Sequence, residues 1–460
     1  MLKFKKVENK HLKSIQKYLK FNNYELCDAS IGVMFMWEEH YNFYFAIFKD
    51  TLILKSNSKD GKQRFFPPIG LNKEEAYKKI EEYSIKNAIQ LEYICVDESE
   101  ALALEQRYGK IEKRFNRDFS DYIYSYSEIE TFVGKKFSGQ RNHINAFKKL
   151  YPNYKYNALK NKDVEKLVAF LKEYKKQHST MGEIEKKEYE NTLHLLNNLF
   201  VAKFVGGYIT VNKKIVAFTI GEYVGKTLVI HVEKALREYR GAYPTMFNEF
   251  VKHVKKDGVE FINREDDSGD LGLRTSKTQY QPIKISNKNH VIVKKPMNIE
   301  KIPTLRGKNI TLGEIKKSDA LAYYKLYVAV KNNRYWGYNY KKDLDGKNVE
   351  DFYNLAKTDF KKKDNAVFII RKNKELIGEV ILYNFNYSGQ VEIGIRLLKK
   401  AQGKGYAVEA LNKMTNYVKD ELKKEPFAKC YLKNEASKKL FLKCGYKITS
   451  QDKKYYYFNI

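Results

Sequence analysis

Cysteine, proline and tryptophan are scarce in this sequence. Four cysteines, eight prolines and two tryptophans occur among 460 residues. The cysteines form no C-x-x-C pair, and we interpret them as reduced thiols of a cytosolic protein. We therefore predict no metal site. The four cysteines are Cys27, Cys95, Cys430 and Cys444.

Long apolar runs are also absent. None reaches the roughly 18 residues that a membrane-spanning helix requires, and the N-terminus MLKFKKVENKHLKSIQKYLK lacks the apolar core of a signal peptide. With 43% hydrophobic residues, the chain is nevertheless too apolar to be disordered. We expect a soluble, cytoplasmic protein of about three domains, at roughly 150 residues per domain.

Acidic residues are too few to balance the basic ones. The chain has 86 Lys and Arg against 56 Asp and Glu, a formal net charge of +30. This charge favours anionic partners such as nucleic acid, an acidic membrane surface or a phosphate-rich cofactor. The alternative is a solvated, lysine-rich surface without such a partner.

A long-period repeat organises the chain. Residues 208–250 contain a β-rich run, an Asn-Lys-Lys turn, a second β-rich run, a Gly-containing turn, a third run and a small-residue loop before a helix. Residues 368–414 follow the same order, and residues 44–70 begin a fainter third copy. Such turns between β-rich runs predict antiparallel strands in each copy. The matched positions are Asn212 and Asn373, Gly225 and Gly389, and Tyr243 and Tyr406.

The repeat predicts an α/β (α+β) fold of three units, each a mixed, mostly antiparallel sheet flanked by helices. Asn287–Pro303 is polar and holds two of the eight prolines, so we place a linker at 291–303. We place the boundary between the first two units near Tyr151, and these units could share one sheet or pack tightly. The predicted units are residues 1–150, 151–290 and 304–460.

The stretch IRLLKKAQGKGYAVEAL, residues 395–411, joins a predicted strand to a predicted helix. Residues 391–395 alternate as in a half-buried strand, and helical spacing begins close to Gly405. A Gly-rich loop at a helix N-terminus favours an anion, because unpaired N–H groups and the helix dipole point at it. Gly403 and Gly405 would let the backbone approach the anion closely. The loop therefore suggests a pyrophosphate ligand, with a purely structural turn as the alternative.

Three ordered segments of the C-terminal part resemble the GNAT superfamily of N-acetyltransferases. The loop resembles the pyrophosphate motif Gln/Arg-x-x-Gly-x-Gly/Ala, and NEASKKLFLKCGYK resembles the second motif, Asn-x-x-Ser before a helix and Gly-Phe or Gly-Tyr. LRGKNITLGEIKKSDA and the later WGYN resemble the subgroup that acetylates ribosomal-protein N-termini and antibiotics. The resemblance covers about residues 304–460. The matching residues are Gln402, Gly405, Ala407, Asn434, Ser437, Gly445 and Tyr446.

The resemblance implies acetyl-CoA as cofactor and an amine as acceptor. Backbone groups of Arg396 and Leu397 would pair with the pantetheine arm and stabilise an oxyanion. Asn434 and Ser437 would line the thiol end of the cofactor. The pyrophosphate loop that the resemblance implies consists of Gln402, Gly403, Lys404, Gly405, Tyr406 and Ala407.

The proposed reaction needs a base for the acceptor amine, directly or through water. Glu392, on the strand face of Arg396, is the catalytic candidate, since similar positions serve as base in some relatives. Its alternative role is a surface or cross-strand ion pair, and Glu379 is the competing carboxylate. Phe441 stands where many relatives carry a proton-donating Tyr. Another group or water would then protonate the thiolate, or transfer is slow or lost.

Two segments of the N-terminal part, residues 117–156 and 261–282, resemble a bacterial family of unknown function. That family is related to the catalytic domain of phosphatidylglycerol lysyltransferase, a tandem pair of acetyltransferase-like units. The resemblance covers nearly all of residues 1–293. Relatives of known activity use aminoacyl-tRNA as donor, which would suit the basic charge. In 261–282, carboxylates such as Asp267 and cations such as Arg274 could grip an amine or form a structural ion-pair network.

Three functions therefore stand side by side. The first is transfer of acetyl from acetyl-CoA to an amine by the C-terminal domain. The second is an aminoacyl-tRNA-dependent transferase within residues 1–293 that modifies a lipid or peptide. The third is a non-enzymatic scaffold that binds tRNA or protein. Candidate acceptors for the first range from a protein N-terminus to a polyamine, an aminoglycoside or a cell-wall precursor.

Overall fold

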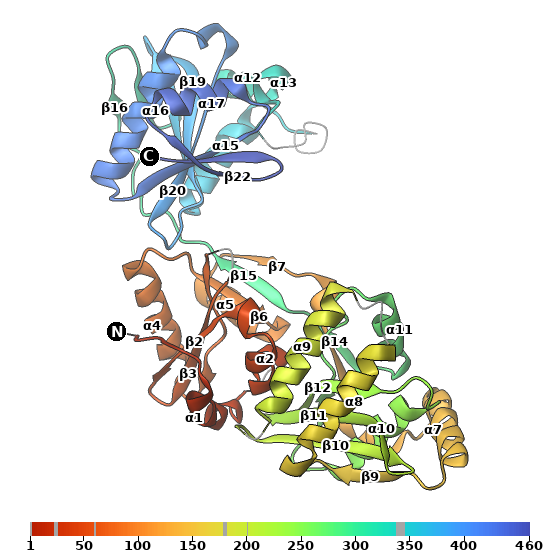
Figure 1. Ribbon diagram of the computed structural model, residues 1–460. Helices are drawn as coiled ribbons and strands as arrows, with labels where there is room; N and C mark the ends of the chain where they lie inside the picture. Colours follow the sequence, from red (N-terminus) through yellow and green to blue (C-terminus); the bar gives the residue numbers. More distant parts are fainter. Residues whose placement is uncertain (1, 23–25, 59–60, 178–181, 200, 337–345) are drawn as a thin grey trace. The chain divides into compact units, whose positions relative to one another are not determined.

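The computed structural model (Figure 1) describes residues 2–22, 26–58, 61–177, 182–199, 201–336 and 346–460. The chain divides into two compact units. Unit 1 comprises Met1–Tyr83 and Leu91–Ile292, and unit 2 comprises Ser84–Gln90 and Val293–Ile460. Within the described part of the chain, no helix combines the length and apolar character needed to cross a bilayer.

Unit 1 contains two open sheets. The first has the order β1-β2-β3-β4-β6-β15-β7, with β5 paired to β3. Its pairs are antiparallel from β1 to β4, and β4 runs parallel to β6. The strands are β1 (Lys5–Lys6), β2 (Phe43–Phe48), β3 (Thr51–Asn57), β4 (Gln63–Phe65), β5 (Ile69–Gly70), β6 (Glu92–Val96), β7 (Ile111–Arg114) and β15 (Asn289–Val293).

The second sheet has the order β14-β8-β13-β12-β11-β10-β9. Only β12 and β13 are parallel; the other pairs are antiparallel. Its strands are β8 (Asp121–Ser125), β9 (Lys155–Ala158), β10 (Phe204–Val211), β11 (Lys214–Val224), β12 (Thr227–Ala235), β13 (Phe261–Asn263) and β14 (Lys284–Ser286).

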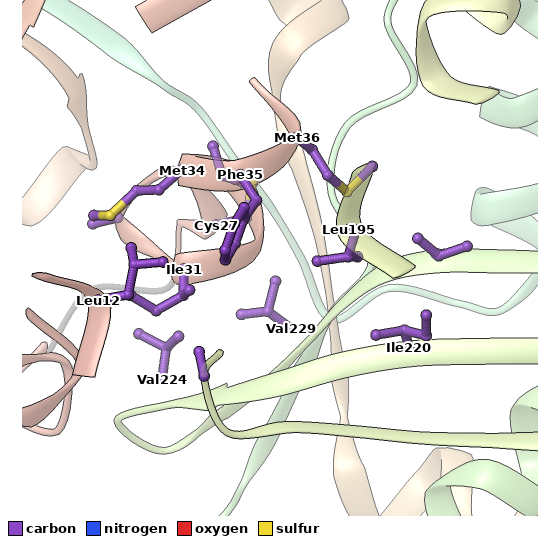
Figure 2. Close-up of a cluster of buried hydrophobic side chains, with 14 of the residues drawn as sticks. Leu12, Cys27, Ile31, Met34, Phe35, Met36, Leu195, Ile220, Val224 and Val229 are labelled. Carbon is purple, nitrogen blue, oxygen red and sulfur yellow. The ribbon is translucent and has the colours of Figure 1, made fainter. Parts of the chain in front are cut away.

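Helices cover both faces of the second sheet. α8 and α9 run side by side over one face (Figure 1), and their Leu171 and Leu195 are fully buried. This core also takes in residues of the first sheet and of α1 and α2, so the two sheets share one core. Figure 2 shows Leu12 and Ile31 near Val224 and Val229 in this shared core. The helices are α1 (Asn9–Leu19), α2 (Ile31–Met36), α3 (Glu38–Tyr41), α4 (Lys73–Lys86), α5 (Glu98–Tyr108), α8 (Val164–Gln177) and α9 (Glu183–Asn197).

The opposite face of the second sheet has a separate core. Phe247 and Phe250 of α10 are fully buried there, together with Phe147 of α7. Burying each such side chain stabilises the fold by roughly 1.5–3 kcal/mol. The helices on this side are α6 (Tyr126–Thr131), α7 (Ser138–Leu150) and α10 (Ala242–His253), and α11 (Leu271–Gln279) follows β13.

Unit 2 is one sheet with the order β16-β17-β18-β19-β20-β21-β23-β22. Only β20 and β21 are parallel. α16 and α17 pack on one face, and α12 and α15 pack on the other. The elements are β16 (Leu305–Arg306), β17 (Thr311–Gly313), β18 (Ala366–Lys372), β19 (Glu375–Tyr383), β20 (Gln390–Leu397), β21 (Glu425–Tyr431), β22 (Lys447–Gln451), β23 (Tyr455–Asn459), α12 (Ala320–Val328), α13 (Val330–Asn333), α15 (Val349–Lys361), α16 (Tyr406–Asn416) and α17 (Glu435–Lys443).

The predicted fold class, mixed and mostly antiparallel sheets flanked by helices, is confirmed. The order β10-β11-β12-α10-β13 in unit 1 matches β18-β19-β20-α16-β21 in unit 2. The Asn-Lys turns also match: Asn212 and Lys213 have φ of 48° and 70°, and Asn373 and Lys374 have 48° and 69°. Two consecutive positive φ values suit the right-handed twist of a tight hairpin.

The boundaries inside the N-terminal part differ from those that the sequence suggested. β8, at Asp121–Ser125, pairs with β13 and β14, so the second sheet already begins about thirty residues before the suggested boundary at 150. β15, at Asn289–Val293, pairs with β6, so the linker placed at 291–303 starts within a strand of the first sheet. Both pairings join segments far apart in sequence, which local composition does not encode.

Candidate functional site

The Gly-rich loop of unit 2 lies open at the start of α16. After β20, a single 3-10 turn (Lys399–Ala401) leads into the loop, and Gly405 is the N-cap of α16. Gly403 and Gly405 have φ of 74° and 80°, the left-handed region that favours glycine. A Cβ at either glycine would meet no atom within 4 Å. Residues 402–405 are all exposed, so backbone N–H groups of the loop and first helical turn can face a ligand.

Two side chains of the loop, those of Gln402 and Tyr406, form hydrogen bonds with other parts of unit 2. Gln402 donates from Nε2 to the carbonyl oxygen of Leu397, at 3.1 Å. The Tyr406 ring is buried, and its hydroxyl accepts a hydrogen bond from Lys372. Tyr406 therefore offers a ligand its backbone rather than its ring. Ala407 is half-buried, and Lys404 points into solvent.

β20 and β21 part at the end next to this loop. They pair in parallel only at residues 390–392 with 425–427. Beyond that point, β20 continues its ladder with β19 as far as Leu397, while β21 pairs with β23. The C-terminal half of β20 therefore has a strand on one side only, among the described strands. The structure brings Leu397, the Gly-rich loop and the start of α17 to this end of the sheet.

Arg396 turns its side chain to the α12 face. The guanidinium donates to Glu379 and to Asn333, the latter at 2.6 Å. It lies 3.9 Å from the ring centroid of Tyr327 and 4.5 Å from that of Trp336. Charge pairing and aromatic faces thus fix this buried side chain. Of the predicted WGYN motif, only Trp336 falls within the described residues.

Glu392 is buried with both carboxylate oxygens engaged. Oε1 accepts from the Tyr383 hydroxyl at 2.7 Å, and Oε2 accepts from Asn384 Nδ2 at 2.7 Å. Lys429 Nζ lies 3.5 Å from Oε2. Tyr383 sits directly across the β19–β20 ladder from Glu392. Burial, followed by the charge of Glu392, raises the pKa of Tyr383. This geometry is the cross-strand arrangement that the sequence left open as the alternative to a catalytic role.

The second predicted motif caps α17. Asn434 is the N-cap, and its Oδ1 accepts from the N–H of Ser437 at 3.2 Å. Both residues are half-buried. Phe441 lies in the core, 2% exposed, with its ring 5.3 Å from those of Tyr446 and Phe458. Phe441 therefore packs as a core residue and has no hydroxyl to donate.

The corresponding loop of unit 1 is covered. α10 begins after Gly241, which has φ of 83° and serves as its N-cap. A Cβ at Gly241 would lie 2.5 Å from the carbonyl oxygen of His143 and 3.0 Å from Cβ of Phe147. Both residues belong to α7, which therefore occupies the space that a ligand would need. β12 and β13 also pair at only three positions, residues 227–229 with 261–263.

The charged residues of segment 261–282 are paired within unit 1. Arg264 donates to Glu233 at 3.0 Å and lies 4.4 Å from the ring centroid of Phe247. Asp267 is fully buried and accepts from Tyr122 at 2.6 Å and from Arg274 at 2.7 Å. Burial alone would raise the pKa of Asp267, but these hydrogen bonds hold it below its usual range. The arrangement favours the structural ion-pair network over a grip on a free amine.

A buried cluster around Lys288 links the two sheets of unit 1, and no sequence pattern indicates it. Lys288 Nζ lies 3.0 Å from Asp28, 2.8 Å from Asp121 and 3.3 Å from the Cys27 sulfur. Cys27, Asp28 and Asp121 could together ligate a metal, but the ammonium of Lys288 already lies against both carboxylates. Burial, reinforced by Asp121, raises the pKa of the Cys27 thiol. All four cysteines are free thiols, as predicted, and all four are buried.

His231 of β12 lies in a second buried cluster, which connects the second sheet to α2. Its Nδ1 lies 2.8 Å from Glu265 and its Nε2 lies 2.9 Å from Glu222. Burial would lower the pKa of His231, but the hydrogen bonds with both carboxylates raise it to about 9. Gly32 of α2 donates its N–H to Glu222 at 2.6 Å, and a Cβ on Gly32 would collide with the imidazole. The sequence pointed to neither His231 nor Gly32, because their partners are distant along the chain.

Comparison with known proteins agrees with the division of the chain into two units. Residues 21–288 match the family model "Phosphatidylglycerol lysyltransferase, C-terminal", and residues 309–447 match the "Acetyltransferase (GNAT) domain". A conserved protein of unknown function from Bacteroides thetaiotaomicron, solved by crystallography, is 29% identical, with a TM-score of 0.60, over 64% of this chain and 100% of that one.

Two weaker similarities accompany these matches. An uncharacterised protein of Mycoplasmoides gallisepticum is 22% identical over 43% of this chain, and the match spans 64% of that relative's length. A GNAT-family acetyltransferase structure from Bacillus anthracis is 20% identical, with a TM-score of 0.30, over 34% of this chain and 98% of that one. The chain belongs to the phosphatidylglycerol lysyltransferase C-terminal family through residues 21–288, and it carries a GNAT acyltransferase domain at residues 309–447.

Proposed function

We propose that unit 2 transfers an acetyl group from acetyl-CoA to an amine. The observation that supports this proposal most directly is the open loop at Gly403 and Gly405, beside the end of β20 that β21 does not pair with. A GNAT domain match over the same residues agrees with it. When bound, acetyl-CoA would supply the activated acetyl group as a thioester.

The residues of the loop would hold the cofactor's phosphates. N–H groups between Gly403 and Ala407 would donate to a pyrophosphate, and the dipole of α16 would favour its charge. Lys404 would add a flexible positive charge from the solvent side. The remaining residues proposed to contact the cofactor are Gln402, Gly405 and Tyr406 in the loop, the backbone of Arg396 and Leu397 on β20, and Asn434 and Ser437 at α17.

We propose that Glu392, together with Tyr383, takes up the proton that the acceptor amine releases. Both oxygens of Glu392 are occupied, so a proton from an acceptor amine would reach it through Tyr383 or water rather than by direct contact. In Glu392→Gln, we expect kcat to fall by roughly 10²–10⁴ with acetyl-CoA affinity unchanged. Tyr383→Phe tests separately whether the proton reaches Glu392 through the Tyr383 hydroxyl. A Glu392→Gln enzyme that is fully active, whatever its stability, would leave Glu392 with a structural role alone.

The decisive experiment is a calorimetric titration of acetyl-CoA into the full chain. Binding of roughly micromolar strength is expected, and Gly405→Glu should abolish it by placing a carboxylate against the pyrophosphate. Gly389→Glu is the matched control, because Gly389 has the same φ of 80° and equally open surroundings but lies in the β19–β20 turn. If the wild-type protein does not bind, the acetyltransferase proposal fails and only the fold assignment stands.

A second function, aminoacyl transfer from aminoacyl-tRNA by unit 1, is proposed on family membership. The formal net charge of the whole chain, +30, suits a polyanionic partner. Titration of tRNA at increasing salt tests it, because phosphate contacts make log K fall linearly with log salt. Binding of both acetyl-CoA and tRNA without turnover of any amine or lipid would instead support the scaffold alternative.

A further inference from the structure

The face of the unit 2 sheet opposite α16 carries an aromatic surface beside the end of β20. Residues of β21 that follow the last pair with β20 alternate in direction, so Lys429 and Tyr431 share the face of Glu392. β23 sets Tyr457 opposite Lys429, and Tyr455 opposite Tyr431. These side chains therefore flank the end of the sheet where acyl transfer is proposed, on the side away from the helix that would bind phosphates.

The tyrosine rings form a continuous wall. The centroids of Tyr431 and Tyr455 are 4.7 Å apart, and Tyr335 lies 5.8 Å from Tyr431. The Tyr431 and Tyr455 side chains are only partly buried. Rings in this arrangement present flat, accessible surface against which an acceptor can rest.

Two lysines sit on this wall. Lys454 Nζ is 5.3 Å from the ring centroid of Tyr431 and 5.2 Å from that of Tyr455. Lys429 Nζ is 5.7 Å from the Tyr455 centroid. Lys429 shares its charge with Glu392, whereas no carboxylate of the described chain comes within 4.0 Å of the Lys454 ammonium. Among the described residues, the Lys454 ammonium is thus a positive charge of this wall that pairs with no carboxylate.

Asp452, an exposed carboxylate two residues before Lys454, is engaged by other donors. Asp452 accepts from the N–H groups of Lys454 and Tyr455, each at 2.7 Å, and from the Tyr457 hydroxyl at 2.7 Å. The pKa of Tyr455 reflects the positive field: partial burial would raise it, but hydrogen bonds with Tyr431 and Lys454 and the lysine charges lower it. A second cation arriving here would meet repulsion, and an anion would meet attraction.

We propose that the acceptor of unit 2 carries an anionic group, a carboxylate or a phosphate, close to its reactive amine, and that Lys454 and Lys429 bind this group against Tyr431 and Tyr455. The proposal builds on acetyl transfer at the same site and narrows its acceptor class. Polyamines and aminoglycosides, which are polycations, are disfavoured, and an acidic peptide N-terminus or a small phosphorylated amine is favoured.

The test compares acceptors that carry an anionic group with partners that lack it. The C-terminally amidated acidic peptide Ala-Glu-Glu is paired with amidated Ala-Gln-Gln, O-phosphoethanolamine is paired with ethanolamine, and spermidine is the polycation. For the wild-type full chain, kcat/KM should be roughly threefold to tenfold higher for at least one anionic member than for its neutral partner, as expected for a near-surface charge contact. The pair with the larger ratio identifies carboxylate or phosphate as the natural group.

Lys454→Gln should bring this ratio close to one. Lys453→Gln is the matched control, because Lys453 is an exposed neighbour of the same charge, and it should leave the ratio unchanged. Ratios near one in the wild-type protein, spermidine as the best acceptor, or equal effects of the two variants would overturn the proposal. If no acceptor turns over, the same ratios of dissociation constants from calorimetry decide it. Acetyl-CoA binding by wild type and its loss in Gly405→Glu report separately on the proposed function.

Discussion

Two helices of this chain begin at a glycine with nearly the same backbone conformation, yet only one start is open. Gly241 and Gly405 have φ of 83° and 80°, and each follows the strand that pairs in parallel with the next strand of its sheet. At Gly241 the carbonyl of His143 occupies the adjacent space, whereas nothing approaches Gly405. A helix start of this kind therefore becomes an anion site only when no neighbouring element covers it.

A similar contrast concerns two buried arginines. Arg396 pairs with Glu379, whose side chain is 0% exposed, and Arg264 pairs with Glu233, whose side chain is 11% exposed. Both guanidinium groups lie against aromatic rings. In unit 2 this pair braces the strand that ends at the open loop. In unit 1 the Arg264–Glu233 pair lies at the corresponding end of the sheet, between the C-terminal end of β12 and the residue after β13.

The largest effect is expected from breaking the fully buried pair. Glu379→Ala should lower the free energy of unfolding of unit 2 by about 3–5 kcal/mol, because it leaves the Arg396 charge buried without its partner. Glu233→Ala should cost unit 1 less, because its pair lies closer to solvent: the side chains of Arg264 and Glu233 are 9% and 11% exposed, against 4% and 0% for Arg396 and Glu379. Urea denaturation of both variants measures the difference. Equal losses would show that the two pairs do not differ in the way their burial indicates.

A smaller effect, and one specific to unit 1, is expected from pH. The folded-state pKa of His231 is about 9, above its ordinary value of 6.5. The protonated histidine therefore stabilises unit 1 fully below about pH 6.5, and this contribution, about 3 kcal/mol at most, is lost as the pH rises through 9. Unit 2 has no histidine.

The measurement is the urea midpoint of the wild-type protein and of His231→Gln at pH 6.5 and 9. Lys55 titrates in the same range with the opposite sign, because burial lowers its pKa to about 8 and its charged form disfavours folding. The difference between the two proteins removes the contribution of Lys55. Parallel pH profiles would show that His231 is not charged in the folded state.

Because Gly241 is covered and Gly405 is open, replacing each by alanine should lower the stability by different amounts. Gly241→Ala adds a clash with the His143 carbonyl to the strain of positive φ, so it should cost about 2–3 kcal/mol. Gly405→Ala adds only the strain, about 1 kcal/mol. Thermal unfolding of the two variants provides the comparison. A Gly241→Ala protein as stable as Gly405→Ala would mean that α7 moves aside easily and that the unit 1 loop is not closed.

Local patterns in the sequence predicted what local structure determines. The Asn212-Lys213 and Asn373-Lys374 turns, the strand before the loop and the helix after Gly405 all appear where the pattern placed them. A tight turn, an alternating strand and a glycine N-cap each depend on a few consecutive residues. This is why the fold class and the position of the loop could be inferred without a structure.

Contacts between distant segments could not be inferred. Lys288 meets Asp28 and Asp121 because it lies where the chain passes from β14 of the second sheet to β15 of the first, and no spacing in the sequence links these three residues. The cover over Gly241 comes from α7, far away along the chain. The burial of Glu392 beneath Tyr383 likewise depends on the register of two strands. These three contacts bear on whether the residues concerned have a structural or a functional role, and none of them can be inferred from the sequence.

The smallest effect is expected from the lysine of the open loop. Lys404 is exposed, so Lys404→Ala should leave stability unchanged and weaken acetyl-CoA binding only roughly threefold to tenfold, as a solvated charge contact would. Arg240, the corresponding residue of the covered loop, should have no effect on the same affinity when replaced by Ala, and Lys413→Ala controls for charge at the far end of α16. Because salt screens such contacts, the loss in Lys404→Ala should shrink as ionic strength rises. If Arg240→Ala weakened binding as much as Lys404→Ala, general surface charge rather than the open loop would attract the cofactor.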